Sequence, residues 1–104
     1  MDANEVYSQL VLAGEEWAEL QAAYNILEDT KSAILAKLML NSGANSVAAR
    51  EIEAKASQEF TNHVKTTQEA MKAALKAKVK YESAKMWVEL KRSEEATRRA
   101  EMKL

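Results

Sequence analysis

A heptad row of apolar residues near the N-terminus constrains this chain more than any other feature. Spacings of three and four residues alternate along eleven positions, and ten of the eleven are non-polar or aromatic: Ala3, Val6, Leu10, Ala13, Trp17, Leu20, Tyr24, Leu27, Lys31, Ile34 and Leu38. Such a row forms one apolar stripe on one face of a helix. Asn41-Ser42-Gly43 follows as a stop signal, because Gly readily adopts the left-handed conformation that ends helices. The pattern predicts a helix over about residues 3–41.

The rest of the chain contains few residues that interrupt a helix. It has no Pro and only two Gly among 104 residues, and these two residue types are the strongest helix breakers. Ser46 and Ser57 can each cap a following helix, which predicts a short helix over about residues 47–56 and a long one over about residues 58–103. The apolar face expected on this last helix consists of Phe60, Val64, Met71, Leu75, Val79, Met86, Trp87 and Leu90.

These elements predict an all-α fold. Two long helices joined by a short connector pack antiparallel, so residues 1–104 are expected to form a single helical domain, a long antiparallel helical hairpin with a short connecting helix. A two-helix hairpin buries little surface per residue. Further apolar residues, among them Val11, Leu12 and Ile26, lie outside the heptad row. We therefore expect the protein to be oligomeric, as a homo-oligomer.

Hydropathy and charge restrict the partners. No apolar run approaches the ~18 residues of a membrane span, and no secretory signal opens the chain, so we expect no membrane partner and a cytoplasmic location, in the host cell cytoplasm if a phage encodes the protein. Residues 1–30 carry seven acids and no Lys or Arg, whereas residues 72–104 carry ten bases and five acids. This asymmetry indicates either self-association, acidic end to basic end, or a polyanionic partner.

Residues suited to catalysis are scarce, which argues against an enzyme. The chain has one His, His63, no Cys and no glycine-rich loop for phosphate. No nucleophile with a base and an orienting group can be assembled from this set. We interpret His63 as a surface or hairpin-interface residue, and we expect no catalytic residue, no cofactor and no metal site.

One acidic motif, Glu15-Glu16-Trp17-Ala18-Glu19, has a catalytic counterpart. It matches the E-E-x-x-E opening of the MazG-like nucleotide pyrophosphohydrolases, whose carboxylates share one helix face and hold Mg²⁺ through oxygen ligands. That family needs a second acidic pair of the form E-x-x-D, and no Asp follows Asp29 in this chain. We favour a solvated helix face, with a MazG-like hydrolase as the less favoured alternative.

Basic residues form two rows on the last predicted helix. The rows are Lys72, Lys76 and Lys80 at four-residue steps, and Lys78, Lys85 and Arg92 at seven-residue steps. Residues at these spacings share a helix face. Tyr81 and Trp87 lie nearby, and cations interleaved with aromatic rings suit single-stranded nucleic acid. The alternative, in which these cations solvate the helix and pair with acids, stays open, and we expect Trp87 in the core rather than as a stacking platform.

Two further lysines stand in the first predicted helix. Lys31 interrupts the apolar heptad row, where a cation must snorkel, pair or meet a ligand. Lys37 lies near the end of the same helix, where the helix dipole favours a cation.

The segment that begins at Lys31 resembles the UvsY-like phage recombination mediator family. It reads Lys31-Ser32-Ala33-Ile34-Leu35-Ala36-Lys37-Leu38-Met39-Leu40-Asn41-Ser42-Gly43, similar to the family's Lys/Ala/Leu-rich stretch that closes in a basic residue, Leu, three residues and Ser-Gly. The order of the helices is also similar. The resemblance implies an all-helical, ring-shaped oligomer that places basic residues of this stretch on single-stranded DNA. Lys37 matches the family's second basic position and Lys31 matches less closely, whereas the first basic position is Leu35 here.

The leading hypothesis is a phage-type recombination mediator, an oligomeric protein that binds single-stranded DNA and assists the loading of a RecA-like recombinase. Phosphate contacts carry no sequence preference, and the residues expected to make them are Lys31, Lys37, Lys72, Lys76, Lys80 and Arg92. The main alternative is a non-enzymatic structural or assembly adaptor whose charged ends serve protein contacts alone.

Overall fold

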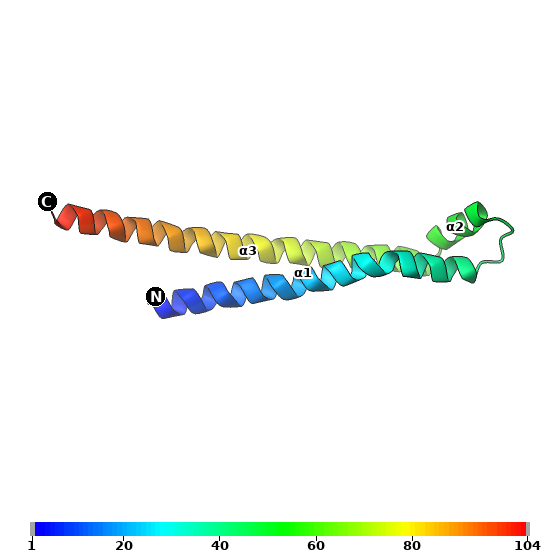
Figure 1. The fold of residues 1–104 in the computed structure, drawn as a ribbon, viewed down its shortest axis with the longest axis horizontal. Helices are drawn as coiled ribbons and strands as arrows, with labels where there is room; N and C mark the ends of the chain where they lie inside the picture. Colours follow the sequence, from blue (N-terminus) through cyan, green and yellow to red (C-terminus); the bar gives the residue numbers. More distant parts are fainter. Residues whose placement is uncertain (1, 104) are drawn as a thin grey trace. The chain divides into compact units, whose positions relative to one another are not determined.

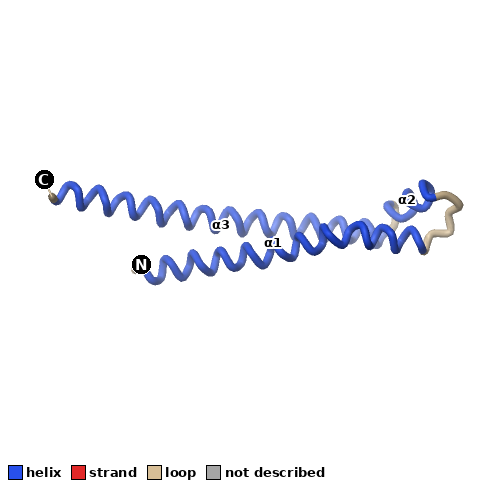
Figure 2. The backbone as a smooth tube through the Cα atoms, viewed as in Figure 1, coloured by secondary structure: helices blue, strands red, loops and turns tan. Residues whose placement is uncertain are grey.

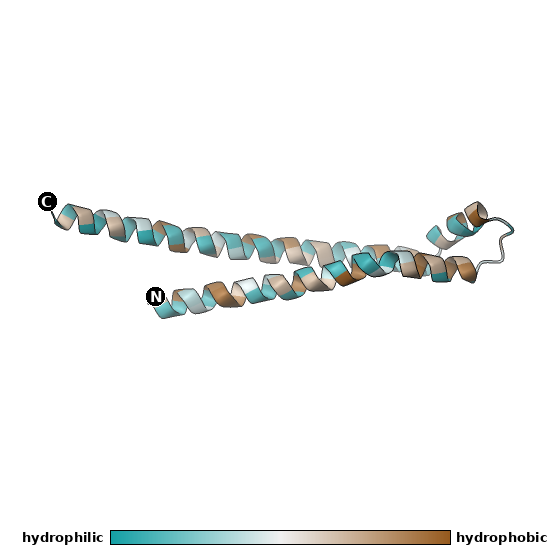
Figure 3. Ribbon diagram, in the orientation of Figure 1, coloured by the Kyte–Doolittle hydropathy of each residue, from teal (hydrophilic) through white to brown (hydrophobic). Residues whose placement is uncertain are grey.

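The computed structural model describes residues 2–103, and within this range the chain forms three α-helices and no strand (Figures 1 and 2). Helix α1 spans Ala3–Leu40, α2 spans Val47–Lys55 and α3 spans Gln58–Met102. The all-α class is confirmed, and each bound lies within one residue of the expected bound. Hydrophobic and hydrophilic segments alternate along both long helices (Figure 3), as the heptad pattern requires.

Serine hydroxyls cap the two helices that follow the loop. The Ser46 Oγ accepts a hydrogen bond of 3.1 Å from the backbone N–H of Ala49. The Ser57 Oγ accepts one of 3.2 Å from the backbone N–H of Phe60. Each bond satisfies an N–H group that the first turn of a helix leaves unpaired, so both predicted caps are confirmed.

The end of α1 differs from the expected left-handed glycine stop. No glycine in the described residues has a positive φ, and α1 has already ended at Leu40, before Gly43. The Ser42 side chain organises the loop instead: its Oγ donates to a Glu53 carboxylate oxygen at 2.8 Å and accepts from the Ala44 N–H at 3.2 Å. A side chain that bonds the backbone and α2 thus reverses the chain without a left-handed residue.

The chain divides into two compact units. Unit 1 comprises residues 1–19 and 75–104, and unit 2 comprises residues 20–74. Each unit contains one segment of α1 and one segment of α3, and unit 2 also contains the loop and α2. That residues 1–104 form a single domain stays a prediction.

Unit 2 contains a cross-helix hydrogen bond. The Nε2 of His63 on α3 lies 3.0 Å from the carbonyl oxygen of Leu27 on α1, so this nitrogen carries the proton that is donated. The adjacent Phe60 and Thr67 are buried, and the Thr67 hydroxyl donates to the His63 carbonyl at 2.8 Å. His63 therefore joins the two helices, which confirms that it lies at a helix–helix contact.

Unit 1 is packed around small residues and one pair of aromatic rings. Ala13 of α1 and Ala77 of α3 are buried. The rings of Trp17 and Tyr81 lie with their centroids 5.5 Å apart, a separation typical of favourable aromatic pairs. A Cβ placed on Gly14 would lie 3.4 Å from the Tyr81 ring, so Gly14 marks a close contact between the two helices.

The heptad row of α1 is the row that packs. From Val6 to Leu38 every member except Lys31 is buried or half-buried. Lys31 is exposed, and its stem reaches solvent from a position that otherwise faces the neighbouring helix.

The packed row of α3, by contrast, agrees with the predicted one only at its start, where Phe60 is buried and Val64 is half-buried. Its buried or half-buried members alternate spacings of three and four and are mostly small: Phe60, His63, Thr67, Ala70, Ala74, Ala77, Tyr81, Ala84 and Val88. The larger apolar residues expected in the core, Met71, Leu75, Val79, Met86, Trp87 and Leu90, are between 41% and 69% exposed. Alanines in the contact row allow a short distance between helix axes, which turns the larger side chains outward.

None of the described helices is both long and apolar enough to span a bilayer.

Candidate nucleic-acid interface

The six candidate phosphate-binding residues are divided between the two units. Lys31, Lys37 and Lys72 belong to unit 2, whereas Lys76, Lys80 and Arg92 belong to unit 1. All six side chains are exposed.

Unit 2 does not gather its three candidate lysines. Lys31 lies one turn beyond Leu27 on α1, and Lys72 lies nine residues beyond His63 on α3. Because Leu27 and His63 are bonded and the two segments run in opposite directions (Figure 2), Lys31 and Lys72 are separated by roughly 20 Å along the helix axes at about 1.5 Å per residue.

One candidate lysine is paired with an acid. The Nζ of Lys80 lies 3.2 Å from a Glu16 carboxylate oxygen. Both side chains are largely exposed, and such surface pairs contribute only about 0–1 kcal/mol. The other two ion pairs within residues 2–103 are Lys55–Glu51 and Lys91–Glu94. Of the six candidates, Lys80 alone takes part in an ion pair in this range.

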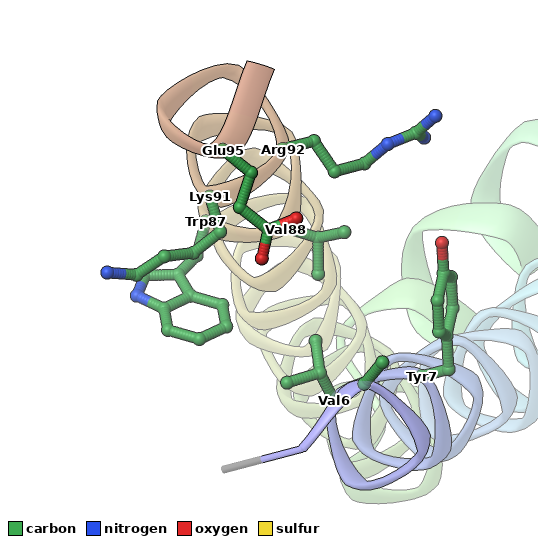
Figure 4. Close-up of a pocket in the computed structure, with 8 residues that line it drawn as sticks. Val6, Tyr7, Trp87, Val88, Lys91, Arg92 and Glu95 are labelled. Atoms are coloured by element: carbon green, nitrogen blue, oxygen red, sulfur yellow. The ribbon is translucent and has the colours of Figure 1, made fainter. Parts of the chain in front are cut away.

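A cleft forms where the first turns of α1 lie beside α3 in unit 1. Its lining residues are Ala3, Val6, Tyr7, Trp87, Val88, Lys91, Arg92 and Glu95, and we call it the aromatic cleft. Its volume of about 610 Å³ lies within the range of roughly 300–1,000 Å³ that is usual for ligand sites. In Figure 4 the Val6 and Val88 side chains point toward each other across its floor.

Each side of the aromatic cleft combines a ring with a cation. Tyr7 and Arg92 lie on one side of Val6 and Val88, and Trp87 and Lys91 lie on the other (Figure 4). Tyr7 is 50% and Trp87 44% exposed, so both rings present surface to solvent. The prediction that Trp87 belongs to the core is therefore wrong, because Val88, not Trp87, occupies the packed row of α3.

Two charged groups modify the electrostatics of the cleft. The Lys91 Nζ lies 5.6 Å from the centroid of the Trp87 ring, within the distance for a cation–π attraction. The Glu95 carboxylate points inward between the two sides (Figure 4). The cleft thus holds two cations and one acid, a net positive charge that favours an anion over a cation.

The row Lys78, Lys85 and Arg92 extends from the Tyr7 side of the cleft along α3. Seven-residue spacing keeps these cations on one side of the helix. The Lys78 Nζ lies 6.0 Å from the Trp17 ring centroid, at the limit of a cation–π contact. None of the three cations of this row takes part in an ion pair within residues 2–103.

The arrangement suits a flexible polyanion with flat groups. Lys and Arg bind phosphates without regard to sequence, and exposed aromatic rings stack on nucleobases. Within residues 2–103 no group of three His, Cys, Asp or Glu side chains could hold a metal ion, and this includes Glu15, Glu16 and Glu19.

Two residues that line the aromatic cleft, Tyr7 and Lys91, were not among the residues predicted from the sequence. Tyr7 stands 85 positions before Arg92, and only the antiparallel pairing within unit 1 brings the two together. Lys91 follows Trp87 by four residues, a spacing that places a cation over a ring on the same helix; this local signal was available for one side of the cleft.

Comparison of the chain with protein-family models, with curated proteins and with solved structures found no match. No family is assigned to it on this basis, and the likeness of residues 31–43 to the UvsY-like mediators stays a prediction.

Proposed function

We propose that the protein is a non-enzymatic, oligomeric single-stranded DNA-binding protein of the recombination-mediator type. In this proposal α1 and α3 form one antiparallel hairpin, several hairpins associate, and a DNA strand follows the cationic side of unit 1. The protein acts in the cytoplasm and assists a RecA-like recombinase. The recombinase part rests on the resemblance of residues 31–43 to the mediator family.

The observation that supports DNA binding best is the aromatic cleft. Tyr7 and Trp87 are exposed rings, each beside a cation, in one cleft of unit 1. A ring that is only packing material would be covered, because each aromatic side chain gains free energy from burial. Stacking of a base on such a ring contributes about 1–3 kcal/mol and works for every base.

Cations along α3 supply the electrostatic part of the affinity. Arg92, Lys85 and Lys78 continue from the cleft at seven-residue steps, about 10.5 Å apart at 1.5 Å per residue. Each phosphate neutralised on a single strand lowers the logarithm of affinity by about 0.7 per tenfold rise in salt. Three such contacts would weaken binding about 40-fold between about 50 and 300 mM salt.

Fluorescence anisotropy with labelled oligo-dT at low salt tests this proposal. We expect wild-type protein to bind with the steep salt dependence given above, and Tyr7→Ala, Trp87→Ala and Arg92→Ala each to weaken binding. Lys65→Ala is the matched control, since Lys65 is an exposed lysine of α3 that belongs to unit 2. Glu95→Gln removes the one acid of the cleft and should tighten binding.

Two results would refute the proposal. The first is the absence of binding at low salt. The second is binding that Lys65→Ala weakens as much as Arg92→Ala does, because the affinity would then reflect only the total charge.

The alternative is a structural or assembly adaptor, and one observation favours it. Large apolar side chains on the outside of both long helices, such as Val11, Val79 and Met86, are exposed, and exposed apolar rows mark protein contacts. The DNA titration separates the two functions, since an adaptor would form oligomers and leave the labelled strand free.

A further inference from the structure

Four apolar residues of α3 in unit 1 form a row that covers nothing in the described structure. Leu75, Val79, Met86 and Leu90 follow at spacings of four, seven and four residues and are all exposed. These spacings keep them on one face of the helix. The face lies opposite the contact row of unit 1, in which Ala77 is buried and Tyr81, Ala84 and Val88 are half-buried. We call these four residues the outer row of α3.

The chain has enough surplus surface for contacts with other copies. Its accessible surface is 8049 Å², whereas a compact monomer of 11.6 kDa would expose about 5,800 Å². One partner's share of a stable interface is about 800 Å². The surplus of roughly 2,200 Å² therefore accommodates two such interfaces on every copy.

Charge decides which surface can cover the outer row. In unit 1 the α1 segment, residues 1–19, carries five acids and no base, whereas the α3 segment, residues 75–104, carries nine bases and five acids. The two segments form one ion pair with each other in the described residues, Glu16 with Lys80. Most of these opposite charges are therefore available to another molecule.

A second α3 is a poor partner for the outer row. Lys76 and Lys78 lie three residues from Val79 and Leu75, respectively, and so flank the row on its two sides. Two α3 segments, each with a net charge of +4, would bring like charges together, which weakens association.

The outer face of α1 offers a complementary surface. A shallow groove on this face is lined by Asn4, Tyr7, Ser8, Val11, Leu12 and Glu15. Val11 and Leu12 are exposed apolar residues, and Glu15 and Glu19, one turn apart, add negative charge. Apolar side chains with acids beside them suit an apolar row with lysines beside it.

We propose that the outer row of α3 packs on the outer face of α1 of a second copy of this chain. The contact joins two different surfaces, so each copy uses its α3 face toward one neighbour and its α1 face toward the other. Head-to-tail contacts of this kind close into rings or continue as filaments. The inference rests on the proposed function for the oligomer alone and does not require DNA binding; the two share one residue, Lys78, which flanks this interface and also belongs to the cation row proposed to bind DNA.

Light scattering coupled to gel filtration, without DNA, tests the apolar part of the interface. We expect an oligomer for wild type and a monomer for the double variant Leu75→Lys, Met86→Lys, because two buried lysines would desolvate on the neighbour's apolar surface. Both residues are exposed in the single chain, so circular dichroism should show unchanged helix content. Met102→Lys is the matched control, since Met102 is an exposed methionine outside the row, and it should leave the oligomer intact.

Charge reversal on each face tests which surfaces meet. The α1 variant Glu15→Lys, Glu19→Lys and the α3 variant Lys76→Glu, Lys78→Glu should each lower the mass of the oligomer. Mixing the two variants should restore association, because the reversed faces are again complementary. A wild-type monomer would overturn the proposal. An α1 variant that still forms the full oligomer would also overturn it, because this result would indicate that α3 packs on α3 of the neighbour.

The same samples separate this proposal from the proposed function. If the protein forms the oligomer but does not bind oligo-dT, the interface is supported and the DNA-binding proposal is refuted. If a monomer binds oligo-dT with the expected salt dependence, the DNA-binding proposal is supported and the interface is refuted.

Discussion

Units 1 and 2 use segments of the same two long helices but hold them together by different means. Unit 2 contains the buried Phe60, a hydrogen bond between His63 and Leu27, and a loop tied to α2 by Ser42 and Glu53. Unit 1 relies on small residues and the ring pair of Trp17 and Tyr81.

The difference extends to the surfaces of the two units. Unit 1 contains the aromatic cleft, the cation row of α3 and the end of α3, whose residues from Glu89 to Met102 are all helical and exposed. Unit 2 contains the hydrogen bonds that join α1 to α3 and the loop to α2. The comparison indicates that unit 2 defines the fold, whereas unit 1 leaves its side chains available to partners.

The largest expected effect is on stability, from Phe60→Ala in unit 2. Phe60 is the one large aromatic side chain that is buried in the described residues, and removal of a buried Phe costs about 3–5 kcal/mol. Urea unfolding followed by circular dichroism measures it. Trp87→Ala is the control, and its loss of stability should be smaller than that of Phe60→Ala because the Trp87 side chain is 44% exposed. Equal losses for the two variants would contradict the contrast between the units.

The next effect is on binding, from Trp87→Ala and Tyr7→Ala in unit 1. Each removes one stacking surface worth about 1–3 kcal/mol, which corresponds to a roughly five- to 150-fold weaker affinity for oligo-dT. Trp87→Phe and Tyr7→Phe keep a ring and should retain most of the affinity. Anisotropy titrations at fixed salt provide the measurement, and wild-type affinity in both alanine variants would remove the aromatic cleft from the proposed site.

A smaller effect is expected from His63→Ala. The variant loses the bond to the Leu27 carbonyl, and a hydrogen bond of this kind contributes about 0.5–1.5 kcal/mol. His63→Gln retains a side-chain donor and should recover part of the loss. Hydrogen exchange resolved along the chain should report faster exchange in residues 20–74 than elsewhere; a uniform change along both units would argue against the local role.

The smallest effect is a gain, from Gly14→Ala in unit 1. The new Cβ would meet the Tyr81 ring at 3.4 Å, an ordinary van der Waals contact, and Ala favours a helix interior over Gly by about 1 kcal/mol. The unfolding midpoint should therefore rise slightly. Gly14→Leu, which needs more room than this contact leaves, should lower the midpoint. A lower midpoint for Gly14→Ala would show that the two helices cannot adjust at this contact.

The parts of the fold that follow from local chemistry were predictable from the sequence. The packed row of α1 is visible as alternating spacings of three and four, and Ser46 and Ser57 signal the two helix starts because a hydroxyl satisfies unpaired N–H groups next to it in sequence. These features depend on residues within a few positions of each other. The helix bounds could therefore be placed within one residue.

The candidate site was predictable only in part, for the same reason. The cations of α3, Arg92 among them, are visible as evenly spaced rows. Nothing in the local sequence marks Tyr7, because its partner across the cleft comes from the far end of the chain. Which cations of α3 lie close to an acid of α1 also depends on how the two helices pair. Among Lys76, Lys80 and Arg92, only Lys80 forms an ion pair in residues 2–103, with Glu16.

The three helices, the inward face of α1 and the opposite charges of the two long helices follow from patterns local to each segment of the chain. The inward face of α3 does not, because it depends on how α3 pairs with α1. Hydrophobicity ranks Leu75 and Met86 above Ala77 and Ala84 as core residues, yet the alanines are in contact and the larger side chains face outward. The physical reason is that burial depends on how closely two helix axes approach, and that distance is a property of both helices together.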